Sequence, residues 1–194
     1  MRLLLASLSL SALVFAQPLT KGERDRAMSE LHASRKQLID AVAGLSAKQL
    51  DFRASAEAWS IAEIAEHLAM TEDLLFNTHK QIAAGAADPA QTAKQKDEEL
   101  LKAIRSRVEK FKAPPMLHPK KNFPDTAAAL AAFKERRDRT IVFVETTTGD
   151  NLRHKIMPDF GMDAYQIFLM MAAHTQRHVE QIQEVKAAAG YPKK

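Results

Sequence analysis

Two histidines near the C-terminus have the spacing of paired metal ligands. His174 and His178 stand four residues apart in the segment H-T-Q-R-H, so in an α-helix their imidazoles lie on one face, one turn apart. Neutral imidazole is a common metal ligand, and two rings placed in this way can bind one ion. Ile167, Met171 and Ile182 fall on the same helical face, which indicates that both rings point into the protein. A pair alone is also typical of two histidines at a core edge that are satisfied by hydrogen bonds.

A third histidine, His67, strengthens the metal interpretation. In the segment A-E-H-L-A it lies three residues after Ile64 and four before Thr71, beside the apolar stripe of another helix. Helical bundles build metal sites from side chains on facing helices, and buried imidazoles are costly unless a partner satisfies their nitrogens. We therefore predict one divalent ion on His67, His174 and His178, with Zn²⁺ as the first choice and Ni²⁺ as the alternative, because imidazole suits both.

The other four histidines receive plainer interpretations. His32 lies at the edge of an apolar helical stripe and is expected at the boundary between core and solvent. His79 comes near the end of the second long helix, where an imidazolium would complement the helix dipole. His118 and His154 fall in loops and are expected to be exposed. For His154 the alternative is a position over the mouth of the site.

Glu63 is the acidic residue nearest to the predicted ligands by helical position. It precedes His67 by one turn, which makes it a candidate general base or fourth ligand. It also follows Ser60 by three residues, and this is the spacing of a capping box at the start of a helix. The capping role already explains the glutamate, so no catalytic residue is assigned from the sequence.

Three histidine ligands favour an enzyme over a structural metal site. Structural zinc is usually closed by four protein ligands, whereas three ligands leave a position open. An ion there can acidify a water, which leads to hydrolysis, or present a thiolate, which leads to group transfer. The alternatives are a bundle that binds a metal or small molecule without catalysis, and a purely structural bundle. The sequence contains no cysteine, which excludes cysteine nucleophiles, cysteine–zinc sites and disulfides.

The composition indicates that helices position these residues. Of the 194 residues, 46% are hydrophobic and 27% are charged, as in an ordinary globular domain. Glycine and proline number only 6 and 8, while helix-forming residues dominate the long segments. The net charge of +4 is too small and too scattered to indicate nucleic-acid binding. We expect one all-α domain over residues 17–194.

Hydrophobic periodicity predicts four long helices and one accessory helix. The long helices run from about residue 21 to 45, 60 to 84, 125 to 146–149 and 163 to 189, and the accessory helix lies within 91–112. Strand-forming residues at 140–148 have no evident partner strand, so they are assigned to the end of the third long helix. Asp163 and Gln166 have the spacing of a capping pair at the start of the fourth.

The connection between the second and third long helices is much longer than the others. It covers about 40 residues, from 85 to 124, and ends in a proline-rich stretch that cannot be helical. This length predicts an antiparallel first pair of helices, a crossover and a second pair, in place of simple up-and-down order.

Residues 1–16 have the form of a secretory signal peptide. Arg2 precedes an apolar run from Leu3 to Ala16, which is shorter than the about 20 residues of a membrane span. Val14 and Ala16 suit the small-residue rule for cleavage. We predict cleavage after Ala16 and export to the periplasm or the extracellular space, with no membrane association afterwards. An uncleaved membrane anchor is the alternative interpretation.

Several motifs in combination resemble one family. The segment G-L-S at 44–46 follows the first helix, W-S-I-A-E-I-A-E-H-L opens the second, and F-G at 160–161 precedes H-T-Q-R-H-V-E-Q-I on the fourth. This combination, which extends over roughly residues 25–187, resembles the DinB-like domains, whose superfamily includes the YfiT-like metal-dependent hydrolases.

The resemblance implies an up-down-down-up four-helix bundle that often forms a homodimer. It also implies a metal ion held by one histidine of the second helix and two of the fourth, here His67, His174 and His178. Some members are thiol S-transferases or thiol-dependent isomerases, and the family name does not imply DNA binding. The signal peptide departs from those cytoplasmic enzymes and favours water over a cytosolic thiol, so hydrolysis of a small-molecule substrate is expected before transfer.

Overall fold

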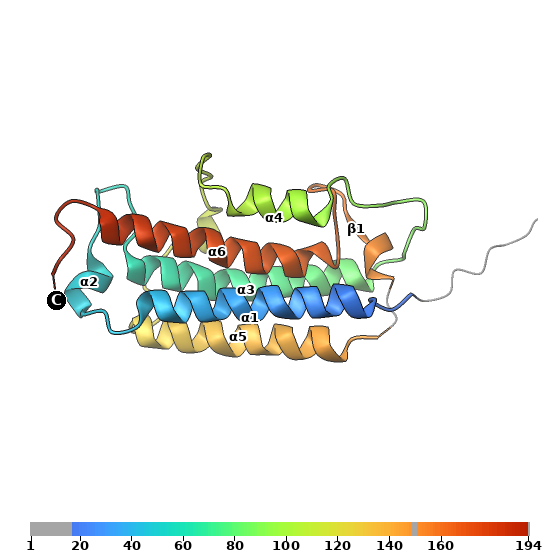
Figure 1. The fold of residues 1–194 in the computed structure, drawn as a ribbon, viewed down its shortest axis with the longest axis horizontal. Coiled ribbons are helices and arrows are strands. Elements are labelled where there is room, and N and C mark those ends of the chain that lie inside the picture. The colour runs from blue at the N-terminus through green and yellow to red at the C-terminus, as the bar shows by residue number, and fades with distance from the viewer. Residues whose placement is uncertain (1–16, 149–150, 194) are drawn as a thin grey trace, which may run out of the picture.

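The computed structural model describes residues 17–148 and 151–193. In this part of the chain four long helices form a bundle (Figure 1). Their bounds are α1 Lys21–Val42, α3 Ile61–Ala84, α5 Thr126–Thr146 and α6 Gln166–Ala187. The shorter elements are the helices α2 Ala47–Asp51 and α4 Asp97–Arg105, the 3₁₀ turns η1 Pro115–Leu117 and η2 Leu152–His154, and the strands β1 Ile156–Met157 and β2 Met162–Asp163.

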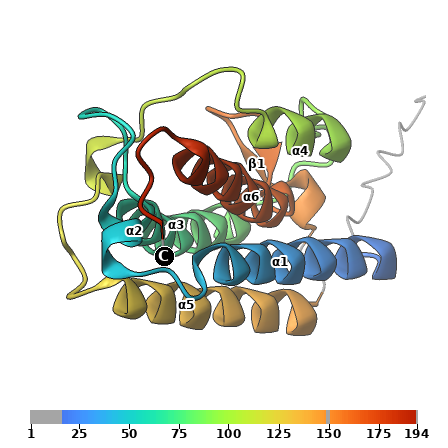
Figure 2. The same cartoon turned by 60° about the vertical axis from the view of Figure 1, so that its left-hand side comes forward.

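The directions of the long helices follow the up-down-down-up order. Helices α1 and α6 run one way and α3 and α5 the other (Figures 1 and 2). Helix α1 packs chiefly on α6 and α5, and α3 packs chiefly on α5 and α6. The predicted four-helix bundle is therefore confirmed. The first pair, α1 and α3, is antiparallel as expected, but the two helices lie across the diagonal of the bundle.

Capping residues determine where the helices begin. Ser60 caps α3: its hydroxyl accepts from the Glu63 amide at 3.3 Å, and the Glu63 carboxylate accepts from the Ser60 amide at 2.9 Å. This confirms the predicted capping box. Trp59 precedes the cap and packs against the apolar cluster that contains Ile64, as in a hydrophobic staple. Thr20 forms an equivalent box at the start of α1.

The fourth long helix begins three residues later than predicted. Oδ1 of Asp163 does accept from the Gln166 amide, at 2.7 Å, but α6 itself begins at Gln166. The preceding residues form an antiparallel hairpin in which Ile156 pairs with Asp163 and Met157 with Met162. The hairpin was not predicted, because two-residue strands are too short to produce an alternating pattern.

The crossover between α3 and α5 carries the accessory helix α4 and passes over two helices of the bundle. Helix α4 packs along α6 (Figure 2) and is shorter than the predicted range 91–112. Arg105, its last residue, donates to Glu30 of α1 at 2.6 Å and to Gln176 of α6. The chain then crosses to α3, where Leu117 of η1 is buried.

A buried ion pair joins the long helices inside the bundle. The guanidinium of Arg137 on α5 is fully buried and binds the Glu72 carboxylate on α3 through Nε···Oε2 and Nη2···Oε1 contacts of 2.9 and 2.5 Å. Its remaining N–H groups donate to main-chain carbonyls and hydroxyls of α1 and α6, namely those of Leu31, Met171, Ser34 and Thr175. One side chain of α5 thus binds groups on the other three long helices.

The predicted leader, residues 1–16, lies outside the described residues. At Gln17 the main chain is paired with Asn151: the Gln17 N–H donates to the Asn151 side-chain oxygen, and the Asn151 N–H donates to the Gln17 carbonyl. None of the helices in the two described stretches has the length and hydropathy of a membrane span.

Candidate metal centre

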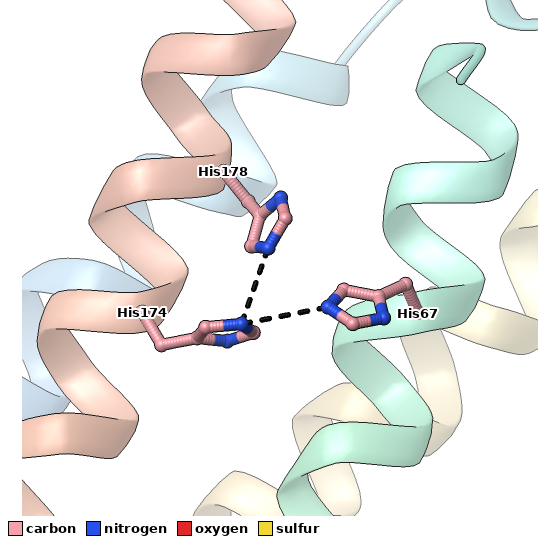
Figure 3. Close-up of side chains that lie close together, drawn as sticks. All are labelled: His67, His174 and His178. Carbon is pink, nitrogen blue, oxygen red and sulfur yellow. Dashed lines mark hydrogen bonds between the residues drawn. The ribbon is translucent and has the colours of Figure 1, made fainter. Parts of the chain in front are cut away.

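The three predicted histidines converge between α3 and α6. His67 projects from α3, and His174 and His178 project from successive turns of α6 (Figure 3). Nε2 of His174 lies 3.4 Å from Nε2 of His67 and 3.2 Å from Nε2 of His178. The structure therefore brings together, across 107 residues of sequence, the set that the sequence predicts.

The spacing of these nitrogens suits a tetrahedral ion. Ligand nitrogens about 2.0–2.1 Å from zinc, at tetrahedral angles, lie about 3.3 Å from one another. The two separations from His174, 3.2 and 3.4 Å, bracket that value. Among the described residues, these three are the group of histidine and acidic side chains whose ligand atoms lie close enough together to share an ion.

Hydrogen bonds on the outer nitrogens orient two of the rings. Nδ1 of His67 donates to the Leu117 carbonyl at 3.0 Å, and Nδ1 of His178 donates to Oε1 of Gln181 at 2.8 Å. Because both acceptors are carbonyl oxygens, the proton of each neutral ring stays on Nδ1 and the Nε2 lone pair faces the centre.

Burial keeps the three imidazoles neutral. Burial, together with smaller effects of neighbouring imidazoles and guanidinium groups, lowers the pKa of His178 to about 3 and the pKa of His174 well below its usual value. Burial also lowers the pKa of His67, although the hydrogen bond to Leu117 opposes that shift. Near pH 7 all three rings are therefore in the form that binds metal ions.

Trp59 and the crossover cover His67 and His178, while His174 is partly exposed. The Trp59 ring lies 4.9 Å from the His67 ring and 6.4 Å from the His178 ring, centroid to centroid, and is nearly parallel to the latter. Arg177, which is buried between the two ligating turns of α6, donates to two carbonyl oxygens of the crossover. The crossover is thereby attached to α6 on one side and, through Leu117, to α3 on the other.

Glu63 does not belong to the cluster. Its carboxylate accepts from the Ser60 amide and forms an ion pair with Arg53. The capping role is confirmed, and the carboxylate is engaged away from the imidazoles. The candidate roles as base or fourth ligand therefore find no support in its contacts.

The remaining histidines lie apart from the cluster. His118 is exposed as predicted, whereas His32 is more exposed, and His154 and His79 more buried, than predicted. His32 and His118 are exposed, and His118 donates from Nε2 to the Ala113 carbonyl. His154 is half-buried, with Nδ1 at 3.1 Å from the Gln91 carbonyl. His79 is fully buried, and its Nδ1 donates to the Ala164 carbonyl at 2.9 Å. The predicted position at an open helix end is wrong, because Ala164 and Phe168 of the segment that follows the hairpin pack over this end of α3.

Two supporting residues were not predicted. Gln181 follows His178 by three residues, a helical spacing that could have identified it as a partner. Leu117 acts through its main-chain carbonyl, for which a side-chain pattern gives no signal.

Two surface hollows among the described residues lie away from the three histidines. One of about 550 Å³ lies between α1 and α4, next to Arg26 and Arg105. The other, about 490 Å³, lies next to Asp97, Arg153 and Gln166. Neither hollow therefore provides a substrate pocket beside the histidines.

Comparisons with known proteins give a family, one sequence relative and one similar structure. The sequence model of the DinB superfamily matches residues 30–182. The uncharacterized protein YuaE of Bacillus subtilis (strain 168) is 24% identical over 163 residues, which are 82% of this chain and 96% of that protein. The structure of YfiT from Bacillus subtilis has a TM-score of 0.61 at 18% identity and covers 90% of this chain and 91% of its own. It is described as a probable metal-dependent hydrolase with an unusual four-helix bundle topology.

Proposed function

Because this chain belongs to the DinB superfamily, we propose that it is a metal-dependent enzyme that acts on a small molecule, as a hydrolase first and as a group transferase in the alternative. The observation that carries the proposal is the convergence of Nε2 of His67, His174 and His178. The description of YfiT as a probable metal-dependent hydrolase supports the same class of activity.

His67, His174 and His178 would hold one divalent ion, Zn²⁺ as the first choice and Ni²⁺ as the second. When bound, such an ion supplies a Lewis-acidic position that acidifies a water or a thiol. The Leu117 carbonyl and the Gln181 amide oxygen keep the protons of two rings on Nδ1 and direct Nε2 inward. Hydrolysis is preferred because the proposed export removes the protein from cytosolic thiols.

A second candidate function is a bundle that binds a metal or a small ligand without catalysis. The crossover and Trp59 cover His67 and His178, His174 is only partly exposed, and neither surface hollow is lined by the three histidines. A largely covered site of this kind suits the retention of an ion as well as turnover. The Glu63 carboxylate is bound to Arg53 and to the Ser60 amide, so it is not proposed as a general base.

Metal analysis of the untagged protein tests the site. We expect about one Zn²⁺ or Ni²⁺ per chain in the wild type, from the three-ligand set. His67→Ala, His174→Ala and His178→Ala should each lose most of the metal while circular dichroism remains helical. His118→Ala is the matched control, because this exposed ring lies 6.2 Å from Trp59 but outside the cluster. Equal metal content in the His174 and His118 variants would contradict the proposal.

Turnover distinguishes the two candidate functions. We expect the metal-loaded protein to hydrolyse a member of a panel of esters and amides, or to transfer a thiol to an electrophile, and a chelator to abolish that turnover until metal is added back. Two results would favour the non-catalytic binding protein. One is stoichiometric metal with neither hydrolysis nor thiol transfer, and the other is a crystal structure in which a fourth protein ligand fills the coordination sphere of the ion.

Export and self-association complete the proposal. The signal-peptide pattern at 1–16 supports export to the periplasm or the extracellular space after cleavage behind Ala16. A homodimer is proposed from the resemblance to DinB-like domains, and light scattering on the purified protein would test it.

A further inference from the structure

A buried glutamate stands directly beside the first candidate ligand. Glu66 immediately precedes His67 on α3, and only 7% of its surface is exposed. One carboxylate oxygen, Oε1, accepts from the main-chain amides of Lys120 and Asn122 at 2.8 and 2.9 Å and from the Asn122 side chain at 2.7 Å. Burying a carboxylate is costly unless hydrogen bonds satisfy it, so this set of amide donors is what retains Glu66 in the interior.

The main chain that donates these bonds has the shape of an anion-binding turn. Lys121, between the two donors, has a φ of 62°, a left-handed conformation that costs free energy for a lysine. In this arrangement the amides of the flanking residues point toward one anion. The Glu66 carboxylate takes the place of that anion and compensates the strained conformation of Lys121.

The same turn continues from the residue that orients His67. Leu117, only three residues before Lys120, gives its carbonyl to Nδ1 of His67 at 3.0 Å. Glu66 and His67, which are consecutive on α3, therefore bind the two ends of one short segment, residues 117–122. If the Glu66 end is released, the strained turn relaxes and the Leu117 carbonyl is no longer held against the imidazole.

We propose that Glu66 is a positioning residue for the metal centre: it fixes the segment 117–122, and through the Leu117 carbonyl it keeps the proton of His67 on Nδ1 and the Nε2 lone pair aimed at His174 and His178. The proposal rests on the proposed function in treating Nε2 of His67 as a ligand atom. It assigns Glu66 no contact with substrate.

Nitrogen NMR of the metal-free protein tests the orientation directly. In ¹⁵N-histidine-labelled wild type, two-bond correlations should show His67 with a protonated Nδ1 and a free Nε2. In Glu66→Ala we expect a mixture of both tautomers and an increase of about tenfold or more in amide exchange over 117–122. Glu66→Gln keeps an oxygen at the acceptor position and should retain the wild-type tautomer with a smaller rise in exchange.

Metal affinity provides the second readout. Competition for Zn²⁺ with a chromophoric chelator should give a Kd about 10–100-fold weaker in Glu66→Ala, the range for loss of an outer-shell partner. Glu66→Gln should lie between Glu66→Ala and the wild type. Asp73→Asn is the matched control, because Asp73 lies on the same helix and pairs with Arg136 and Arg139 of α5. It should leave the Zn²⁺ affinity and the His67 spectrum unchanged.

The outcomes separate this inference from the proposed function. If Glu66→Ala leaves the His67 tautomer and the exchange of 117–122 as in the wild type, the positioning role is wrong, whatever the metal does. If the spectrum changes as expected but the wild type binds no Zn²⁺, the positioning role stands and the proposed function fails. If Glu66→Ala does not fold, two milder variants replace it: Glu66→Gln, and Asn122→Ala, which removes one of the three hydrogen bonds to Glu66. The His67 tautomer and the amide exchange of 117–122 in these variants then decide whether the positioning role is correct.

Discussion

Arg137 binds groups on three other long helices through one buried guanidinium. Its guanidinium is fully buried and binds Glu72 together with acceptors on α1 and α6. Arg137→Met should lower the free energy of unfolding by about 3–5 kcal/mol, because it leaves the Glu72 carboxylate buried without its partner. Urea unfolding measures this loss.

Arg139→Met is the control for that experiment. Arg139 lies on the same helix and pairs with Asp73, but it is largely exposed, so its removal should cost no more than about 1 kcal/mol. Similar losses for the two variants would show that the buried pair has no special role.

Asp163 should make the free energy of unfolding decrease as the pH rises. Burial raises the pKa of its carboxyl to about 6, although the Arg153 guanidinium opposes the shift. The unfolded value is about 3.9, so the folded state holds the proton more tightly. The stability from this residue is present below about pH 4 and is lost as the pH rises to about 6.

The comparison of wild type with Asp163→Asn isolates this contribution. The asparagine can still accept from the Gln166 amide but does not titrate. Between about pH 4 and 6 the wild type should lose on the order of 2 kcal/mol relative to the variant, measured by urea unfolding at fixed pH values. A difference that stays constant, or that changes in the opposite direction, contradicts the raised pKa.

At the residue scale, the sequence predicts side chains that share a helix face and misses groups whose position depends on other segments. His174 and His178 follow from a spacing of four, and His67 follows from its place beside an apolar stripe. The Leu117 carbonyl could not be predicted, because it belongs to the main chain of an irregular segment. His79 was assigned wrongly because its burial is decided by Ala164 and the aromatic residues packed around it.

At the scale of elements, the N-cap of α3 supports the helix that carries His67. The Ser60 hydroxyl satisfies the Glu63 amide, and Ser60→Ala should lower the free energy of unfolding by about 1 kcal/mol, the usual cost of losing an N-cap side chain. Ser29→Ala, an exposed substitution on α1, should change it by less than about 0.5 kcal/mol. Thermal or urea unfolding of the two variants gives the comparison.

Elements with clear end signals were predicted closely, and those without them were not. The capping box at Ser60 placed the start of α3 within one residue. The accessory helix, which has no such signal at its end, stops at Arg105 and not near 112, and the proline-rich stretch contains the 3₁₀ turn η1. Helix α2 has only five residues, and each strand of the hairpin has two. Such short elements are determined by the packing of neighbouring segments and leave no periodic pattern.

At the scale of the whole molecule, the proposed export can be tested on protein recovered from the source cell. The expected mature chain begins at Gln17, and its main chain pairs with Asn151 at the end of the bundle. Intact mass and N-terminal sequencing should therefore find Gln17 first. Recovery of soluble protein that retains Met1 would contradict cleavage after Ala16.

The diagonal placement of α1 and α3 has a consequence for the way the chain folds. Each long helix in the first half finds its neighbours in the second half: Lys186 on α6, for example, donates to the Ala41 carbonyl on α1 across 145 residues. A helical hairpin of α1 and α3 is therefore not a native folding unit. The native contacts of α1 and α3 can form only after α5 and α6 have been synthesised. These contacts close long loops of chain, which lowers the folding rate. A chain that ends before α5 should show no cooperative unfolding transition, unlike the corresponding half of an up-and-down bundle.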